Sequence, residues 1–287
     1  MTDNNEILKT AEGIRSVIKT YQVKNELTFK EDTHTYFIKN KQNKIISDMP
    51  SVSTIIESFF EPFKPESTRA FKNCMGDKDR ETKLLKEWAD SGTYAANKGS
   101  RAHYMLEKKL INTYNGFKEI RKPLFSCDDT QIKDSDNMIN AGNDFLNLMH
   151  KRGAVMLDTE IVLGNIELGY FGQPDNVWLM KTEEDKIGMV ITDWKTNKPK
   201  NFQAQSYTKK MKYPFNKYNS TALEHYFVQI PLYGKLLLKM LENTQFKNIP
   251  LLGGVVVLLK KDATFSEYRI PRYFFNTIES MNVKDYI

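Results

Sequence analysis

The sequence predicts an α/β fold in which a β-rich core follows a mostly helical N-terminal lobe. Three runs typical of strands come one after another in the middle of the chain, at residues 155–164, 169–180 and 186–195. A segment rich in leucine and aromatic residues at 221–243 predicts a long helix, and the continuous apolar run at 251–260 predicts a further strand. Strands joined through a helix in this order are typical of a sheet covered by helices.

The N-terminal lobe begins with a predicted β-hairpin. Residues 27–48 alternate apolar and polar side chains around a central polar turn, as the two strands of a hairpin do. A short helix with Ser51 or Ser53 as its N-cap is expected next. We therefore expect residues 1–94 to form a hairpin and helical lobe, and residues 95–287 to form the core, with the two packed as one compact unit.

Two longer helices are predicted before the core strands. Residues 79–112 have a helical pattern that the pair Ser91–Gly92 could interrupt. A second helix is predicted at 136–152, where Gly153 ends it. The polar segment between them, residues 112–135, is expected to be a loop.

The composition is that of a soluble globular protein, with 40% hydrophobic and 27% charged residues. The net charge of +6 is compatible with a polyanionic partner but does not require one. Cys74 and Cys127 stand alone, outside any C-x-x-C motif, which argues against a disulfide framework or a cysteine-ligated metal. No apolar run is long enough for a membrane span or a signal segment, so we expect a soluble, intracellular protein without a membrane partner.

The second and third strand-like runs carry charged residues that a hairpin would bring together. Asp193 and Lys195 are two apart on a strand and so share a face. If the two runs pair around a turn centred near residue 184, Asp193 lies opposite Asp175. Two converging carboxylates repel each other unless a cation lies between them, which favours a Mg²⁺ or Mn²⁺ site. For an isolated D-x-K pattern, the alternative is an exposed surface ion pair.

Together, these elements resemble the PD-(D/E)XK nuclease superfamily, in particular its RecB-like exonuclease branch. The segment GQPD at 172–175 is similar to the PD element, and DWK at 193–195 is similar to the D-x-K element. The segment PSVSTIIESFF at 50–60 looks like the lead-in of phage and mitochondrial relatives. The resemblance implies a restriction-endonuclease-like core, in which helices flank a mixed central sheet.

Two further motifs of this branch occur in the expected order. Gly99 and His103 fit the G-x-x-x-H pattern that supplies a metal-binding histidine on a helix. Gln229 and Tyr233 fit the Q-x-x-x-Y pattern, whose side chains contact DNA or order the site. Residues four apart share a helix face, so a merely solvated or mixed helix face is the alternative for either pair alone.

The resemblance also implies roles for these residues. The implied ligands of Mg²⁺ or Mn²⁺ are His103, Asp175, Asp193 and the backbone carbonyl of Trp194. Lys195 would orient a water molecule and offset negative charge, and Glu107 would join the catalysis, with a second metal when DNA is bound. Glu160 is either a residue that supports the ligands or an ordinary charge at a strand end. Two unclustered cysteines imply no iron–sulfur cluster.

Basic residues around the motifs suit a DNA partner. Those that could follow phosphates are Lys98, Arg101, Lys198, Lys200, Lys209, Lys210 and Lys212. Aromatic residues interleaved with the last of them are Tyr207, Tyr213, Phe215 and Tyr218. Such a mixture favours single-stranded DNA, on whose bases aromatic rings stack; a mobile surface loop is the alternative for residues 205–219.

The function expected from the resemblance is a metal-dependent DNA exonuclease acting on single-stranded ends or flaps. A phage-type role in DNA recombination, replication or processing, in the host cytoplasm, is expected by analogy. A structure-specific or restriction-like endonuclease on the same core is the first alternative. A catalytically inert DNA-binding scaffold is the second, and the intact D…D-x-K pattern argues against it.

Overall fold

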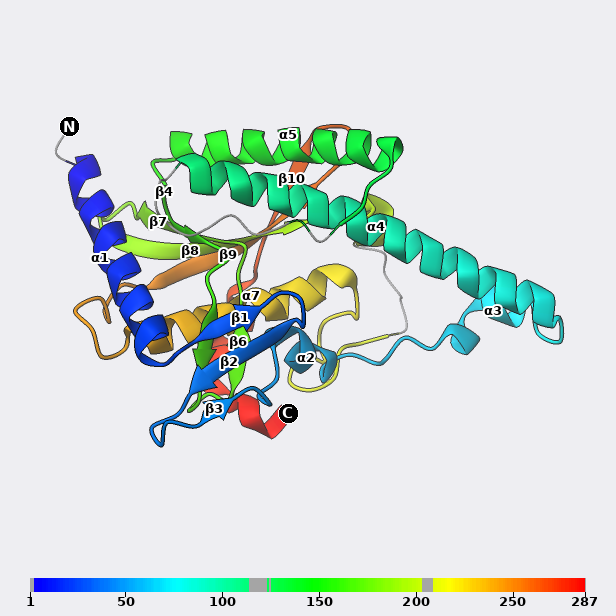
Figure 1. Ribbon diagram of the computed structural model, residues 1–287, viewed down its shortest axis with the longest axis horizontal. Helices are drawn as coiled ribbons and strands as arrows, with labels where there is room; N and C mark the ends of the chain where they lie inside the picture. Colours follow the sequence, from blue (N-terminus) through cyan, green and yellow to red (C-terminus); the bar gives the residue numbers. More distant parts are fainter. Residues whose placement is uncertain (1–2, 114–122, 124, 203–208, 287) are drawn as a thin grey trace.

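The centre of the molecule is a five-stranded mixed sheet (Figure 1). The computed structural model describes the chain except residues 1–2, 114–122, 124, 203–208 and 287. Across the sheet the strands are β10 (Phe265–Arg269), β9 (Leu251–Leu259), β8 (Ile187–Lys195), β7 (Asn176–Lys181) and β4 (Val155–Thr159). β8 and β9 are parallel, while the other neighbouring pairs are antiparallel. The predicted α/β class is therefore confirmed.

Helices cover both faces of this sheet. In Figure 1, α4 (Lys78–Thr113) and α5 (Asp129–Lys151) lie above it, and α7 (Ala222–Leu241) lies below it. Successive strand residues point to opposite faces, so Trp178 and Trp194 pack with α4 and α5, whereas Val177 and Ile191 pack with α7. This double burial explains why β8 reads as an almost continuous apolar run.

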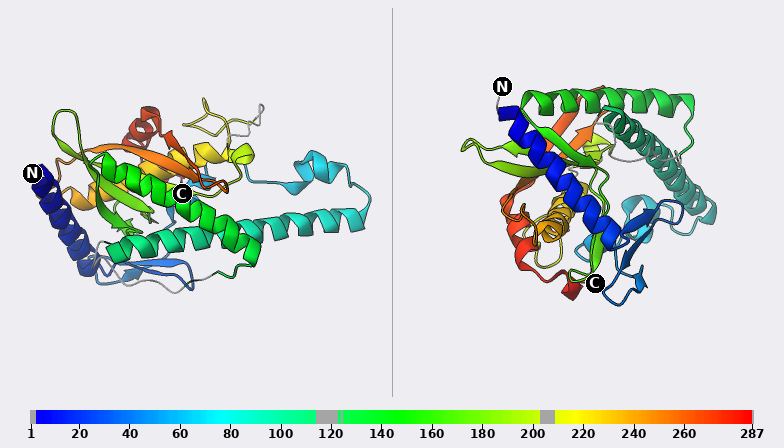
Figure 2. Two further views of the ribbon diagram at one scale, coloured as in Figure 1. Left: turned by 90° about the horizontal axis from the view of Figure 1, so that it is seen from above. Right: turned by 60° about the vertical axis from the view of Figure 1, so that its left-hand side comes forward.

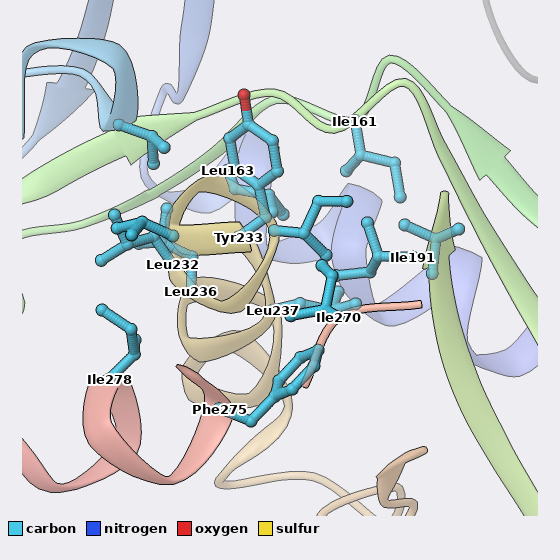
Figure 3. Packing of buried hydrophobic residues seen from close by; sticks show 14 of the residues in the cluster. Ile161, Leu163, Ile191, Leu232, Tyr233, Leu236, Leu237, Ile270, Phe275 and Ile278 are labelled. Atoms are coloured by element: carbon cyan, nitrogen blue, oxygen red, sulfur yellow. The ribbon is translucent and has the colours of Figure 1, made fainter. Parts of the chain in front are cut away.

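The packing below the sheet is dense around α7. Its Leu232, Leu236 and Leu237 lie in one cluster with Ile191 of β8 (Figure 3). Tyr233 lies at the edge of this cluster, and its hydroxyl points away from the apolar side chains. The C-terminal helix α8 (Arg272–Ser280), which the sequence analysis did not anticipate, packs against α7.

The long helix α4 runs without a break through Ser91 and Gly92, so the suspected interruption is wrong. Nothing lies within 4 Å of a Cβ placed at Gly92, and the surrounding half of the helix has no buried residue before Lys98. This half extends beyond the body of the protein, with α3 (Arg69–Lys72) near its start (Figure 2). A single glycine costs a helix about 1 kcal/mol, too little to interrupt 36 residues.

Helix α5 begins earlier than predicted, at Asp129. Its start is fixed by a capping box, in which Asp128 and Gln131 each bind the other's backbone N–H. Residues 129–135 are therefore helical, and the predicted loop at 112–135 is wrong over this part. Gly153 follows the helix with a φ of +74°, as expected of a residue that ends one.

The N-terminal residues pack into the same apolar cluster as α7 and the sheet. Helix α1 (Asp3–Lys24) buries Ile7, Ala11, Ile14 and Ile18 there, at a helical spacing. The predicted hairpin is a three-stranded sheet with strands β1 (Thr28–Lys30), β2 (Thr35–Lys39) and β3 (Ile45–Ile46). Ser51 is the N-cap of α2 (Val52–Glu57), and its side chain accepts a hydrogen bond from the N–H of Thr54.

The first two strand-like runs are each divided. Glu160, with a φ of +49°, separates β4 from β5 (Leu163–Asn165). Pro174, which has no N–H to donate, lies between β6 (Tyr170–Gly172) and β7. The remaining elements are the short helices η1 (Pro65–Ser67), α6 (Pro199–Phe202) and η2 (Val283–Tyr286). Across the described part of the chain, every helix is too short or too polar to cross a membrane.

Candidate functional site

Asp175 and Asp193 face each other at one edge of the sheet. The β7–β8 hairpin pairs Asn176 with Thr192, so the next position outward places Asp175 beside Asp193, as the turn centred near residue 184 predicted. Both residues are buried, with 8% and 2% of their surface exposed. Lys195 forms an ion pair with Oδ2 of Asp193. This pair is therefore not an exposed surface ion pair.

The backbone around Asp175 is held from the neighbouring strand. Its carbonyl oxygen accepts hydrogen bonds from the N–H of Glu160 at 2.9 Å and from the hydroxyl of Thr159 at 2.8 Å. Its carboxylate Oδ2 accepts a third from the N–H of Trp194 at 2.6 Å. These contacts leave the other carboxylate oxygen, Oδ1, directed toward α4.

Helix α4 brings His103 to that oxygen. Nδ1 of His103 lies 3.4 Å from Oδ1 of Asp175. The approach depends on Gly99, because a Cβ at this position would lie 2.8 Å from the Thr196 hydroxyl oxygen. The spacing G-x-x-x-H thus has a physical basis here: the glycine allows the helix to approach the end of β8, and the histidine one turn later reaches Asp175.

Glu160 completes a group that could hold a cation. One ligand atom from each of His103, Glu160 and Asp175 lies within 4.8 Å of the others. One imidazole and two carboxylates suit a divalent ion such as Mn²⁺ or Mg²⁺. The sequence analysis gave Glu160 only a supporting or incidental role. In the structure, its backbone is left-handed, and its side chain lies with those of His103 and Asp175. Asp193 instead pairs with Lys195 and lies at the side of this group.

Glu107 lies one turn beyond His103 on α4 and is buried. With His103 and Glu160 it lines a pocket of about 370 Å³. The turn between β1 and β2 closes this pocket with Glu31 and His34, which no feature of the sequence indicated. The pocket is therefore built from the N-terminal sheet as well as from the core.

The carboxylates and their partners have shifted pKa values. Burial, together with the charge of Asp175, raises the pKa of Asp193 to about 6, although Lys195 opposes the shift. Burial also acts to raise the pKa of Asp175, but the imidazole of His103 and the ammonium of Lys195 hold it below its usual value. The pKa of His103 is raised, because Asp175 outweighs the effect of burial. Asp193 is thus the carboxylate of the pair that is easily protonated, and Asp175 is the one that stays ionised.

The Q-x-x-x-Y residues form a hydrogen-bonded pair beside the carboxylates. Nε2 of Gln229 donates to the hydroxyl of Tyr233 at 2.7 Å. Burial and the nearby charge of Asp193 raise the pKa of Tyr233 well above its usual value, so its hydroxyl keeps its proton. Gly172 makes room for the ring, because a Cβ there would lie 2.7 Å from it.

Tyr226, which the sequence analysis missed, covers Lys195. The ammonium nitrogen lies 4.3 Å from the centre of the Tyr226 ring, a distance suited to a cation–π contact. The Tyr226 hydroxyl donates to Oδ1 of Asn197 at 3.0 Å. The only signal in the sequence was position: Tyr226 lies three residues before Gln229, on the same face of α7.

Of the two basic residues expected to contact DNA beside the site, Arg101 is engaged within the protein and Lys198 is not. Arg101 donates to Asp136 at 2.7 Å and to Ser135 at 2.6 Å, so its guanidinium joins α4 to α5. Lys198 is exposed beyond the end of β8. The side chain of Trp194 is buried against Phe145 of α5.

Residues 211–218 include aromatic side chains that pack against the core. Phe215 is buried against Phe274 of α8, so this aromatic residue cannot stack on a base, and Tyr218 packs on the same ring. Within the described part of residues 205–219, these two rings are therefore fixed by packing against α8, although the backbone there is irregular. Tyr213 is exposed, while Tyr207 lies outside the described residues. Lys200 lies in α6, and Lys209, Lys210 and Lys212 lie beyond it; all four are exposed.

No family model matches the chain, and no curated protein matches its sequence. The function is therefore inferred from the side chains and their geometry.

Proposed function

We propose that the chain is a metal-dependent deoxyribonuclease that hydrolyses phosphodiester bonds at single-stranded ends or flaps of DNA. The observation that carries this proposal is the convergence of His103, Glu160 and Asp175 beside a lysine fixed by a buried aspartate. A hard cation site next to an ammonium group suits hydrolysis of a phosphodiester, whose transition state gains negative charge.

The sheet supports the same proposal. A mixed sheet flanked by helices, with the two carboxylates at the ends of a hairpin, is the arrangement that the resemblance to PD-(D/E)XK nucleases implies. The G-x-x-x-H and Q-x-x-x-Y residues approach the same strand ends from α4 and α7. Four short motifs spread over the chain thus meet at one place.

In the proposed mechanism, His103, Glu160 and Asp175 would hold Mg²⁺ or Mn²⁺, with Asp193 and Glu107 close by. A divalent ion supplies Lewis acidity toward the phosphate and lowers the pKa of a water molecule. Lys195 stays protonated, because Asp193 and Asp175 raise its pKa despite burial. It therefore acts as a cation that orients the water and offsets developing charge, and not as the base. Tyr226 holds the ammonium in place, and Gln229 with Tyr233 borders the site.

Digestion of defined DNA tests the proposal. Circular single strands and end-labelled linear single strands and duplexes are incubated with Mg²⁺, Mn²⁺ or EDTA. Release of nucleotides from linear single strands, dependent on metal, is the expected result. Cleavage of closed circles would identify an endonuclease instead, and DNA binding without cleavage under any condition would identify an inert scaffold.

The lysine variants sharpen this experiment. Lys195→Ala is expected to lower the rate by at least about 100-fold, as loss of one charge-stabilising donor does in other enzymes. Lys186→Ala is the matched control, because Lys186 is exposed and pairs only with Glu184 among the described residues, at the far end of the same hairpin. Equal rates for the two variants would remove Lys195 from the mechanism.

A further inference from the structure

Lys98 is a lysine buried without a counter-charge of its own. Only 2% of its surface is exposed. Within the described ranges, its ammonium has neither a hydrogen bond nor an ion pair, and its Nζ lies 5.9 Å from the centre of the Tyr94 ring. Burying an ammonium without an ion pair costs free energy, and burial accordingly lowers the pKa of Lys98.

A second lysine faces the same ring from the end of the sheet. Lys261 follows β9, and its Nζ lies 5.5 Å from the centre of the Tyr94 ring. The parallel pairing of β8 with β9 sets Lys195 beside Leu258. Continued past the strand ends, this register brings Lys198 level with Lys261. Burial, Lys261 and Lys198 all act to lower the pKa of Lys98, as expected if the three ammonium groups are neighbours.

One carboxylate balances this cluster only in part. Asp134 of α5 pairs with Lys261 and accepts a hydrogen bond from the Tyr94 hydroxyl at 3.0 Å. Its charge attracts Lys98 without forming an ion pair with it. Lys98 and Lys261 therefore share one anion, and Lys198 adds a third positive charge close to Lys98. This excess of positive charge suits an anionic ligand, and lysines bind phosphate as point charges.

We propose that Lys98, Lys198 and Lys261 form a subsite for a phosphate group of the DNA backbone, in which the exposed Lys198 and Lys261 contact the phosphate and the buried Lys98 adds positive charge behind them. Gly99, next to Lys98, touches Thr196 just beyond Lys195, so this lysine subsite adjoins the candidate catalytic site at the same edge of the sheet. A DNA strand that crosses the ends of β7, β8 and β9 would contact the carboxylates first and the lysine subsite next. The subsite rests on the proposed function only for its substrate, because the charge cluster itself is independent of catalysis.

Binding measured without metal tests the subsite separately from cleavage. Fluorescence anisotropy with a labelled single-stranded oligonucleotide in EDTA is compared for the unmodified protein, Lys98→Met and Lys261→Met, with Lys186→Met as the control. Each subsite variant is expected to weaken binding about 5–10-fold and to lower the slope of log affinity against log salt by about 0.7, the value for one phosphate contact on a single strand. The control is expected to leave both quantities unchanged.

Thermal unfolding of the same variants separates binding from structure. Lys98→Met removes a buried unpaired charge, so its Tm is expected to equal or exceed that of the unmodified protein. Weaker binding at an undiminished Tm supports the subsite. Unchanged binding, or weaker binding only together with a lower Tm, would overturn it. A protein that binds the oligonucleotide through these lysines but never cleaves DNA would disprove the nuclease proposal and leave the subsite intact.

Discussion

The backbone N–H of Trp194 donates its hydrogen bond to the side chain of Asp175 and not to a main-chain carbonyl of the neighbouring strand. Strand β7 begins at Asn176, so at this point a carboxylate continues the pairing to β8. One oxygen of Asp175 is thereby used to fix the site, and the other faces His103. The position of this carboxylate is set by the sheet itself, which makes it a rigid part of the candidate site.

Metal binding is expected to depend on Glu160 as much as on His103. Adding Mn²⁺ at 100 times its dissociation constant should stabilise the unmodified protein by about 2.7 kcal/mol. Glu160→Gln and His103→Gln should each lose most of this gain, because each removes one of three converging ligands. Thermal unfolding with and without Mn²⁺ measures it. If Mn²⁺ stabilised Glu160→Gln as much as it stabilises the unmodified protein, Glu160 would not be a metal ligand.

In the metal-free protein, Asp193 and His103 are expected to contribute less and less stability as the pH rises from about 4 to above 6.5, while His225, whose pKa burial lowers to about 4, acts in the opposite direction. The pKa of Asp193 is 3.8 when unfolded and about 6 in the fold, so its proton stabilises the fold at low pH and this stabilisation disappears as the pH passes 6. The pKa of His103 is raised above 6.5, so its contribution disappears as the pH passes that higher value. The lowered pKa of Asp175 acts only below about 3.8.

Unfolding by urea in EDTA across this pH range checks the prediction. Asp193→Asn should flatten the lower part of the profile and His103→Gln the upper part. Added Mn²⁺ should oppose the decline, because metal ligands must be deprotonated. A stability difference between the unmodified protein and Asp193→Asn that stays constant with pH through this range would contradict the assignment.

The aromatic ring of Tyr226, and not its hydroxyl, is expected to support the role of Lys195 in the proposed activity. Tyr226→Leu removes the surface on which the Lys195 ammonium rests and should lower kcat about 10-fold, the equivalent of roughly 1.4 kcal/mol, with little change in KM. Tyr226→Phe keeps the ring, loses only the hydrogen bond to Asn197, and should keep the proposed activity within about threefold of that of the unmodified protein. Equal losses in both variants would show that the hydroxyl, and not the ring, is what counts.

Two glycines should respond in opposite directions to alanine. Gly92→Ala should stabilise α4 by about 0.5–1 kcal/mol, because the position is helical and open. Gly172→Ala should destabilise the protein by about 1–3 kcal/mol, because the new methyl would press on the Tyr233 ring and on Val52. Hydrogen exchange of α4 measures the first change, and urea unfolding measures the second.

The sequence predicted best what depends on neighbouring residues. The pairing of Asp175 with Asp193 follows from the position of one turn, and the His103 face of α4 follows from helical spacing. Tyr226 and Lys261 were missed, and Glu160 was given only a supporting or incidental role, because their positions depend on a left-handed backbone or on contacts between distant segments. Phe215 was misjudged for the same reason: its composition suits base stacking, but packing against α8 decides its place.

The origin of the site residues in different parts of the chain also bears on how the molecule folds. Asp175 and Asp193 belong to one hairpin, and a contact of this kind forms early because the loop to be closed is short. His103 lies on a helix that precedes this hairpin by many residues, and Tyr226 lies on one that follows it. Contacts over such separations form late. We therefore expect the acidic pair to form first, and the residues that would make it reactive to join it only in the completed fold.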